Sequence, residues 1–438
     1  MFKDAYDLEV TCASDAALQA FLSAMDCSLR FDRTAIEEFG AAIELDEEFA
    51  IAHAALGRQL FMLGHSAESA THFKKAVSLA NSATSRERDA IQIANGAVRG
   101  DPQTIAMARA HVERYPTDVF VLAHLLGPFG LLAFSGITDW SEQNIALLRA
   151  TKARYRADDW WHLTTEGFFA AEEGRLMEAS KICERAWGIS ENGNCAHSLA
   201  HLHFEACVLD EGRDFIREWV AEYGDHSNMR HHLLWHLAMI DLESGLEMSD
   251  VFETYDLEFY PATNGPSPLE MLCDNASFLW RCHLAGVEIP VGVCDEVNQY
   301  AESHFGFFGF AFADAHKAMA SALQPSTEKH ETLVAHLSEF ASSANTDVAE
   351  FITQYSGALG AFAKGEYARA VGILEPFLSS SILIGGSNPQ RRIIEETFVE
   401  ACVRAADYDK ADAVLRRRNR KNSVFDQNQH SRIGRLKG

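Results

Sequence analysis

The hydrophobic residues of this chain recur mainly three and four positions apart, the spacing that places them on one face of an α-helix. Few segments show the strict alternation of a half-buried strand, and the 438 residues include only 28 glycines and 10 prolines. A chain of this length exceeds the usual size of a single compact core, so its helices must form several domains or one extended array. The pattern predicts an all-α protein.

The segment AHAALGRQLFMLGHSAESATHFKKAV has the residue spacing of a tetratricopeptide repeat. In such a unit small residues lie where two antiparallel helices touch, and large residues fill the space between them. The positions that match this pattern are Leu56, Gly57, Leu60, Gly64, Phe73 and Ala76.

Turn signatures of the same kind, each after an apolar helix, recur at Gly174, Gly212, Gly245 and Gly365. The first three glycines are 38 and 33 residues apart, which brackets the 34-residue period of the repeat. A glycine fits such a turn because the turn needs a positive φ or no side chain. We therefore expect a tetratricopeptide-like α-α superhelix, a solenoid of helical hairpins that can curl around a central pocket.

Two segments cannot continue the helical pattern. Residues 255–270 contain Pro261, Asn264-Gly265-Pro266 and Pro268, and residues 379–390 contain Gly385-Gly386-Ser387-Asn388-Pro389. We expect residues 1–260 to form an N-terminal and central helical-repeat array. Residues 261–438 are expected to form C-terminal helical repeats with an ordered Gly-Gly-Ser-Asn loop.

The net charge of -25 repels phosphate backbones and anionic lipid headgroups, so we expect neither nucleic acid nor a membrane as partner. The sequence shows no run of 18 or more apolar residues and no signal-peptide pattern in MFKDAYDLEV, which favours a cytoplasmic location. The nine cysteines form no CxxC pair and are expected to be reduced. One basic run is expected to be a solvated helix end: Arg416, Arg417, Arg418, Arg420 and Lys421.

The strongest functional signal is the spacing of histidines. His197 and His201 are four residues apart, as are His232 and His236, so each pair shares a helix face. The pairs are offset by 35 residues, close to one repeat, and equivalent positions in successive repeats should lie side by side. Another step of 35 residues back gives His162 and Glu166, which extends the two columns. Because neighbouring helix axes lie about 8–10 Å apart, these side chains could converge on a small ligand, a water molecule or a metal ion.

Several interpretations of these columns stay open. The first helix of a repeat normally lines the concave face, so the histidines would face a groove bordered by Trp160, Trp161 and Trp235. Alternatively, stacked histidines satisfy one another and backbone carbonyls. Zinc would need three or four ligands at about 2.0–2.3 Å, which the spacing permits, but there is no HExxH motif. His203 is rotated away from His201 and is expected to contact another helix.

Charged residues inside two other apolar helices are further candidates. Asp274 occurs with Arg281, and Asp314 with His316. Buried charges need partners, so these residues either pair structurally or reach the same cavity as the histidines.

The chain resembles the tetratricopeptide repeat protein 38 family across nearly its whole length. The motifs that carry the resemblance are Leu8 to Ser14, AHSLAHLH at 196–203, HLLWHLA at 232–238, DNASFLWR at 274–281, Asp314-Ala315-His316 and GGSNPQR at 385–391. The resemblance implies a repeat fold but no reaction or ligand. It assigns to family motif positions His197, His201, His203, His232, Trp235, His236, Asp274, Arg281, Asp314, His316, Asn388 and Arg391.

Two residues depart from the family pattern. His162 lies in no family motif, so its place in the column depends on spacing alone. The acidic residue that usually follows AHSLAHLH is replaced by Phe204, with Glu205 one position later.

Together these observations predict a helical-repeat protein that binds a small molecule or peptide segment in a His-lined concave pocket, with catalysis left open. The candidate catalytic residues are His197, His201, His232 and His236. The candidate ligand-binding residues are Trp235, Asp274, Arg281, Asp314, His316, Asn388 and Arg391.

The alternative function is a hydrolase- or lyase-type enzyme, in which the histidines act as general base or as metal ligands. Arg281 or Arg391 would fix an anion, although no nucleophile motif such as GxSxG is present. A purely structural scaffold is the third reading. The sequence leaves the cofactor, the metal and homo-oligomer formation undetermined.

Overall fold

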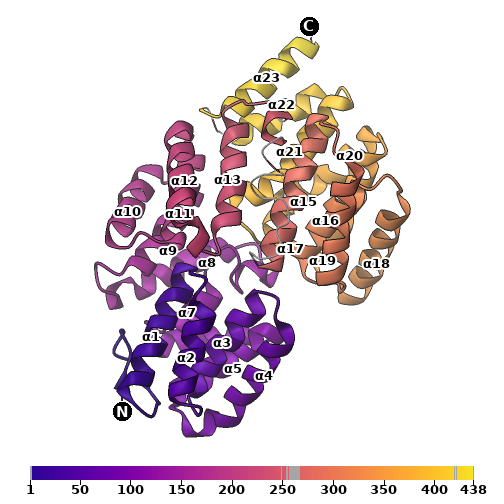
Figure 1. Cartoon of the computed structure of the whole chain (residues 1–438). Coiled ribbons are helices and arrows are strands. Elements are labelled where there is room, and N and C mark those ends of the chain that lie inside the picture. The colour runs from indigo at the N-terminus through magenta and orange to yellow at the C-terminus, as the bar shows by residue number, and fades with distance from the viewer. Residues whose placement is uncertain are drawn as a thin grey trace.

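Helical hairpins follow one another along the chain in this computed structural model, which describes residues 2–247, 249–252, 255, 267–418, 420 and 422–437 (Figure 1). Among these residues the only strands are β1 (Phe2–Lys3) and β2 (Glu9–Val10), which pair antiparallel. The all-α superhelix predicted from the sequence is confirmed. The expected domain boundary at residue 260 and the Asn264-Gly265-Pro266 break lie outside the described residues.

Three groups of helices succeed one another (Figure 1). The first is α1 (Asp15–Arg30), α2 (Ala35–Leu45), α3 (Ala50–Met62), α4 (Ser66–Leu79), α5 (Ser85–Arg99), α6 (Thr104–Arg114) and α7 (Val119–Leu125). The second is α8 (Trp140–Thr151), α9 (Trp160–Glu172), α10 (Leu176–Ile189), α11 (Gly193–Ala206), α12 (Leu209–Tyr223) and α13 (Arg230–Glu243). The third is α15 (Pro268–Ala285), α16 (Val291–His304), α17 (Ala311–Ala322), α18 (Glu328–Ala344), α19 (Asp347–Ala363), α20 (Tyr367–Leu374), α21 (Asn388–Arg404), α22 (Tyr408–Arg418) and α23 (Val424–Lys437).

Short 3-10 segments connect several of these helices. They are η1 (Ala80–Ser82), η2 (Ala133–Ser135), η3 (Lys152–Arg154), η4 (Gly224–His226) and η5 (Glu375–Ile384).

Four of the turn glycines predicted from the sequence have positive φ angles. The values are 85° at Gly64, 74° at Gly174, 82° at Gly245 and 75° at Gly365. Each follows the first helix of a hairpin, where a residue without a side chain adopts this conformation at little cost.

The turn predicted at Gly212 is wrong. Gly212 lies inside α12, where an added Cβ would lie 2.7 Å from the Cβ of His203 on α11. The turn falls instead at Cys207, with a φ of 55°. A close helix contact and a turn both favour glycine, so the sequence alone does not distinguish them.

The superhelix closes on itself through contacts between segments far apart in the chain. The Asn194 side chain donates to the Leu29 carbonyl at 3.0 Å, which joins α11 to α1. The Trp140 indole donates to the Ile382 carbonyl at 3.0 Å, and Gly386 N–H donates to the Pro128 carbonyl at 3.0 Å. These bonds bring η5 and the start of α21 against the segment around α8. The inner face of the array is therefore covered.

Buried hydrophobic residues form two large clusters. One contains residues from Val10 to Phe169, and the other contains residues from Ala196 to Ile433. Two small clusters, built mainly on α9, α10 and α11, lie between them. The helix α13, and part of α11, belong to the second large cluster, while α9 contributes residues to the first.

The basic run near the C-terminus is only partly a solvated helix end. Arg416 and Arg417 are exposed, but the side chains of Arg418 and Arg420 are 5% and 8% exposed. Arg418 pairs with Glu395 and Asp426, and Arg420 pairs with Glu243. Lys421 lies outside the described residues. The expectation overlooked that α13 and α21 supply carboxylates to this run.

One segment among the described residues, Tyr367–Ile384, is long and apolar enough to cross a membrane by length and composition. It contains Arg369 and Glu375, and 28% of it is buried. A single segment of this kind is weak evidence for a membrane span, because core helices of soluble proteins pass the same test.

Candidate functional site

The two histidine pairs meet in one cluster between α11 and α13. His197 and His201 lie one turn apart on α11, and His232 and His236 lie one turn apart on α13. One ring nitrogen of each residue lies within 4.8 Å of those of the other three. The 35-residue offset therefore marks neighbours in space. We call these four residues the histidine cluster.

The histidine cluster is buried, which differs from the groove-facing stripe expected from the sequence. His201 and His236 are 0% exposed and His232 is 1% exposed, whereas His197 keeps partial contact with solvent. The difference arises because the curled array brings α9, α15 and the start of α21 over this face. Of the four residues, His197 alone thus keeps partial exposure to solvent.

Two carboxylates from neighbouring helices fix the orientation of two of the rings. The Nδ1 atom of His201 lies 3.1 Å from Glu172 Oε1, and the Nδ1 atom of His232 lies 2.8 Å from Asp274 Oδ2. Because an ionised carboxylate only accepts hydrogen bonds, each Nδ1 carries the proton. In the neutral form of each ring, the Nε2 atom then holds a lone pair. The His201 Nε2 atom lies 3.0 Å from the Nε2 atom of His197.

His236 has no hydrogen-bond partner for either ring nitrogen among the described residues. Its ring centroid lies 4.5 Å from that of His201, 4.8 Å from that of His232 and 5.3 Å from that of His197. Burying a polar group without a partner costs about 1–3 kcal/mol. The ring is therefore held among the other three at a cost that the protein alone does not offset.

The third pair predicted for the columns, His162 and Glu166, does not reach the cluster. The His162 ring packs on Tyr155, with centroids 4.7 Å apart, and its Nε2 atom lies 3.3 Å from the Leu148 carbonyl. Glu166 pairs with Lys152 at 2.6 Å.

Two other residues of α9, Phe168 and Glu172, lie beside the histidine cluster at the positions predicted for His162 and Glu166. They are also four residues apart. The Phe168 ring lies edge-on to His201, with centroids 4.7 Å apart, and Glu172 accepts the hydrogen bond from the same residue. The residue offset from α9 to α11 is therefore 29 rather than 35.

Unequal repeat lengths explain this error. The helix α11 begins 33 residues after α9 begins, whereas α13 begins 37 residues after α11 begins. The 35-residue offset that relates α11 to α13 therefore does not relate α9 to α11. Sequence reasoning missed Glu172 because the residue lies outside the 35-residue columns, directly before the turn at Gly174.

Asn388 and Arg391 reach the histidine cluster only through Glu172. The backbone N–H of Asn388 donates to Glu172 Oε2 at 2.7 Å, and the Asn388 side chain donates to the Glu172 carbonyl at 2.8 Å. Arg391 donates to the Asn388 side chain at 2.7 Å and to the Gly386 carbonyl. The GGSNPQR segment thus holds the carboxylate that orients His201.

Trp235 and Asp274 also belong to the surroundings of the cluster. The Trp235 ring stacks on His232 with centroids 5.4 Å apart, and Asp274 accepts from His232. Asp274 does not pair with Arg281, which instead donates to Glu396 at 2.8 Å and to the Pro389 carbonyl at 2.9 Å.

Asp314 and His316 do not contact the cluster. Asp314 pairs with Lys317 at 3.0 Å, and the Nδ1 atom of His316 lies 2.7 Å from the Phe312 carbonyl. Asp314 therefore has a structural partner, whereas the Nε2 atom of His316 is buried without a hydrogen-bond partner among the described residues. Glu205, which follows Phe204, pairs with Arg392 at 3.0 Å.

The electrostatics of the cluster differ from one residue to the next. Burial, with the neighbouring histidines, lowers the pKa of His197 and His236 well below the ordinary value. Burial opposes a charge on His232 as well, but Asp274 raises the pKa of that residue. Burial acts to raise the pKa of Glu172, yet the hydrogen bond from His201 and the charge of Arg391 hold it below its usual range.

The donor set and its geometry fit a transition-metal ion. Neutral imidazole is a ligand for zinc, copper, iron and nickel. Zinc bound tetrahedrally at about 2.0–2.1 Å places ligand nitrogens about 3.3 Å from one another. The four nitrogens within 4.8 Å need only small side-chain shifts to reach that arrangement.

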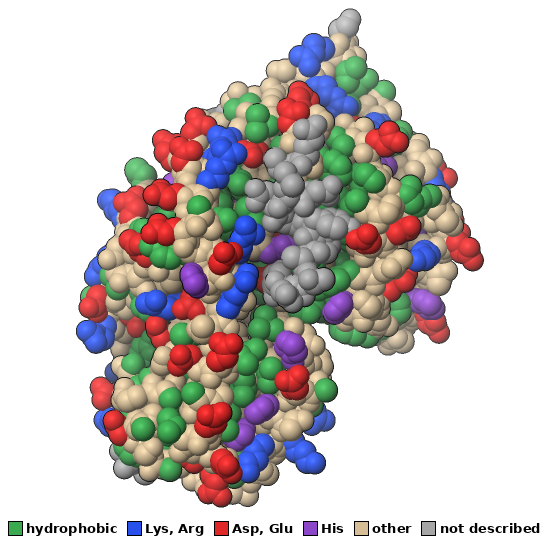
Figure 2. Space-filling view, viewed as in Figure 1, with side chains coloured by type: hydrophobic (Ala, Val, Ile, Leu, Met, Phe, Trp, Pro, Cys, Tyr) green, Lys and Arg blue, Asp and Glu red, His purple; other side chains and the backbone are tan. Residues whose placement is uncertain are grey.

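Among the described residues, the face shown in Figure 2 has no broad basic surface. Acidic side chains stand among lysines and arginines there. This distribution agrees with the negative net charge.

A scan against models of protein families matches none of them. The resemblance to the tetratricopeptide repeat protein 38 family therefore stays a prediction, whereas the helical-repeat architecture is shown. The chain is similar to a solved structure described as "Structure of Naa15/Naa10 bound to HypK-THB", with 12% sequence identity and a TM-score of 0.25. The match covers 91% of this chain and 62% of the other, so this chain spans less than two thirds of its length. At this TM-score we draw no conclusion from the match.

Proposed function

We propose that this helical-repeat protein binds one divalent transition-metal ion, zinc in the first place, at the histidine cluster. The observation that carries the proposal is His236, whose two buried ring nitrogens have no partner among the described residues. A metal ion that takes one of these lone pairs removes much of the cost of burying them.

The carboxylates support the same proposal. Metal-bound histidines usually donate their other ring N–H to a carboxylate or carbonyl, and His201 and His232 do so to Glu172 and Asp274. Two buried carboxylates also balance the charge of a divalent ion, which would otherwise be costly in such surroundings.

A metal-assisted hydrolase or lyase is the second candidate function. It is favoured by the partial exposure of His197, because a catalytic zinc site keeps one position for water or substrate. In this reading a small molecule or peptide segment approaches from the His197 side, and His201, His232 and His236 keep the ion. Arg281 and Arg391 do not fix a substrate anion there, since both are engaged with protein groups.

Metal analysis of the purified full chain tests the first proposal. We expect about one metal ion per chain in the natural protein and none in a His201→Ala/His236→Ala variant with unchanged helical content by circular dichroism. The matched control is His53→Ala/His72→Ala, which removes another histidine pair, with Nδ1 atoms 3.0 Å apart, from α3 and α4. A natural protein that takes up no metal after exposure to zinc, copper, iron or nickel contradicts the proposal.

Loading with cobalt(II) separates the two functions. An ion held by four imidazoles has a fixed visible spectrum, whereas an ion with an open position changes its spectrum when azide binds. A change with azide supports the catalytic reading, and an unchanged spectrum supports a structural metal.

We further propose that the chain acts in the cytoplasm. The negative net charge supports a separate part of the proposal, that nucleic acid and membrane surfaces are not its partners. The expected division at residue 260 and the oligomeric state remain predictions.

A further inference from the structure

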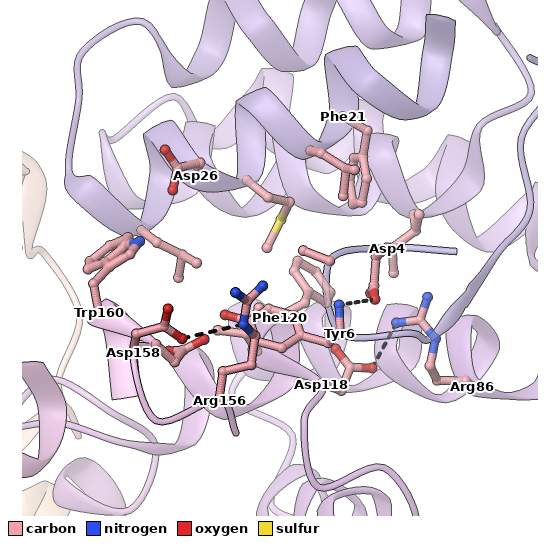
Figure 3. Close-up of a pocket in the computed structure, with 17 residues that line it drawn as sticks. Asp4, Tyr6, Phe21, Asp26, Arg86, Asp118, Phe120, Arg156, Asp158 and Trp160 are labelled. Atoms are coloured by element: carbon pink, nitrogen blue, oxygen red, sulfur yellow. Dashed lines mark hydrogen bonds and ion pairs between the residues drawn. The ribbon is translucent and has the colours of Figure 1, made fainter. Parts of the chain in front are cut away.

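A separate cavity of about 340 Å³ lies in the N-terminal part of the molecule (Figure 3). It is enclosed by the N-terminal hairpin, α1, the start of α7 and the loop before α9. No residue of the histidine cluster lines it. Its volume is within the range of sites for small molecules.

One side of this cavity is apolar and aromatic. It is formed by Phe21, Leu22, Met25, Ile51 and Phe120, with Trp160 at one end. Such a surface takes up a hydrophobic body, and aromatic faces also attract cations.

The lining as a whole carries more carboxylates than cations. The lining contains Asp4, Asp26, Asp118, Asp158 and Asp159 but only Arg86 and Arg156 as basic residues. Arg86 is committed to Asp118, whose carboxylate it approaches to 2.9 Å. Arg156 is 81% exposed and pairs at 3.4 Å with Asp158, which is itself 61% exposed. Asp26 pairs with Arg30 at 2.8 Å. Once these pairs are set aside, Asp4 and Asp159 leave the lining negative.

Asp4 is the most informative of these carboxylates. One oxygen, Oδ1, accepts the backbone N–H groups of Tyr6 at 2.8 Å and Leu8 at 3.0 Å. Among the described residues no basic side chain forms an ion pair with it. Burial raises the pKa of Asp4, so its ionised form would gain from a cation in the cavity.

We propose that this cavity binds a small organic cation, a protonated amine with an apolar or aromatic body. The hydrophobic wall takes the body, and the carboxylates of Asp4 and Asp159 attract the ammonium group. A neutral or anionic analogue of the same shape loses that attraction.

The test measures binding of three probes of matched shape to the full chain by calorimetry or ligand-observed NMR. Phenethylamine is a cation at neutral pH, 2-phenylethanol is neutral, and phenylacetate is an anion. We expect phenethylamine to bind about tenfold more tightly than 2-phenylethanol, and phenylacetate to bind least. Equal affinities for the three probes, or no binding of phenethylamine, overturn the proposal.

Two variants locate the bound probe. Asp4→Asn keeps an oxygen for the two backbone N–H groups and removes only the charge, so the affinity for phenethylamine should fall about threefold while that for 2-phenylethanol stays the same. Leu22→Trp fills the apolar side and should abolish binding of both probes. The control is Glu218→Gln, an exposed position on α12 away from the cavity, which should change neither affinity. If Glu218→Gln weakens phenethylamine binding as much as Asp4→Asn does, the attraction comes from the net charge and the proposal fails.

Discussion

Two regions of this molecule bury histidine in opposite ways. His330, on α18, is 4% exposed, and both of its ring nitrogens have partners: Ser321 Oγ at 2.8 Å and the Ser356 carbonyl at 3.0 Å. His236, in the histidine cluster, is more deeply buried and has no partner for either nitrogen among the described residues. Burial of a histidine therefore does not by itself mark a site. The lack of a partner for both ring nitrogens is what sets His236 apart from His330.

The surroundings of the two residues reinforce the contrast. Gly360 leaves room for His330, because an added Cβ at Gly360 would lie 2.7 Å from the Nε2 atom. That region is built around a neutral imidazole as a packing element. Around His236 the neighbours are other imidazoles and the Trp235 ring, which offer no hydrogen bond of ordinary geometry. The cluster is complete only with a ligand that accepts lone pairs.

The largest expected effect is on metal affinity in His236→Leu. A structural zinc site contributes about 10–16 kcal/mol, so loss of one of four ligands should cost about 3 kcal/mol, or more than about 100-fold in affinity. Competition with a chromophoric chelator measures it. In the absence of metal the variant should be at least as stable as the natural protein, because an unsatisfied imidazole is replaced by an apolar side chain. A marked loss of stability in the metal-free variant would show that His236 is a packing element like His330.

The next effect is on folding in His330→Leu. This change leaves the Ser356 carbonyl and the Ser321 hydroxyl without their histidine partner, so the free energy of unfolding should fall by about 2 kcal/mol. Urea denaturation measures the fall. Metal content should stay unchanged, and its loss here would remove the distinction between the two regions.

A smaller effect is expected from the carboxylates behind the cluster. Asp274→Asn and Glu172→Gln keep the size of the side chain but weaken the hold on His232 and His201, so each should lower metal affinity about tenfold. The control is Glu396→Gln, which alters a partly buried carboxylate that pairs with Arg281 instead. Equal effects of all three changes would mean that the carboxylates act through the fold and not through the ion.

The smallest effect concerns the pH dependence of stability at His330. Burial lowers the pKa of this residue from its ordinary value of 6.5, despite the hydrogen bond with Ser356. The unfolded chain then binds more protons than the folded chain as the pH falls below 6.5, so His330 makes the protein less stable in acid. Urea denaturation between about pH 7.5 and about pH 5, a range that spans the ordinary pKa of histidine, measures the effect. As the pH falls, the free energy of unfolding should decrease less in His330→Gln than in the natural protein. If the two proteins show the same dependence on pH, the His330 imidazole binds a proton as readily in the folded chain as in the unfolded chain.

The sequence by itself determined the all-α class, the repeat character and the pairing of His197 and His201 with His232 and His236. These follow from local rules, since helical periodicity and a four-residue spacing need no knowledge of distant contacts. It also located most turn glycines, because a positive φ has a direct sequence signature.

The tertiary structure alone decided the rest of the site. Whether Glu166 or Glu172 faces the cluster depends on how α9 packs on α11, and unequal repeat lengths shift that register without any local signal. Closure of the superhelix buries the cluster and delivers Asp274 and Asn388 from segments distant in sequence. Such contacts are set by the summed geometry of many helix pairs, which no short stretch of sequence encodes.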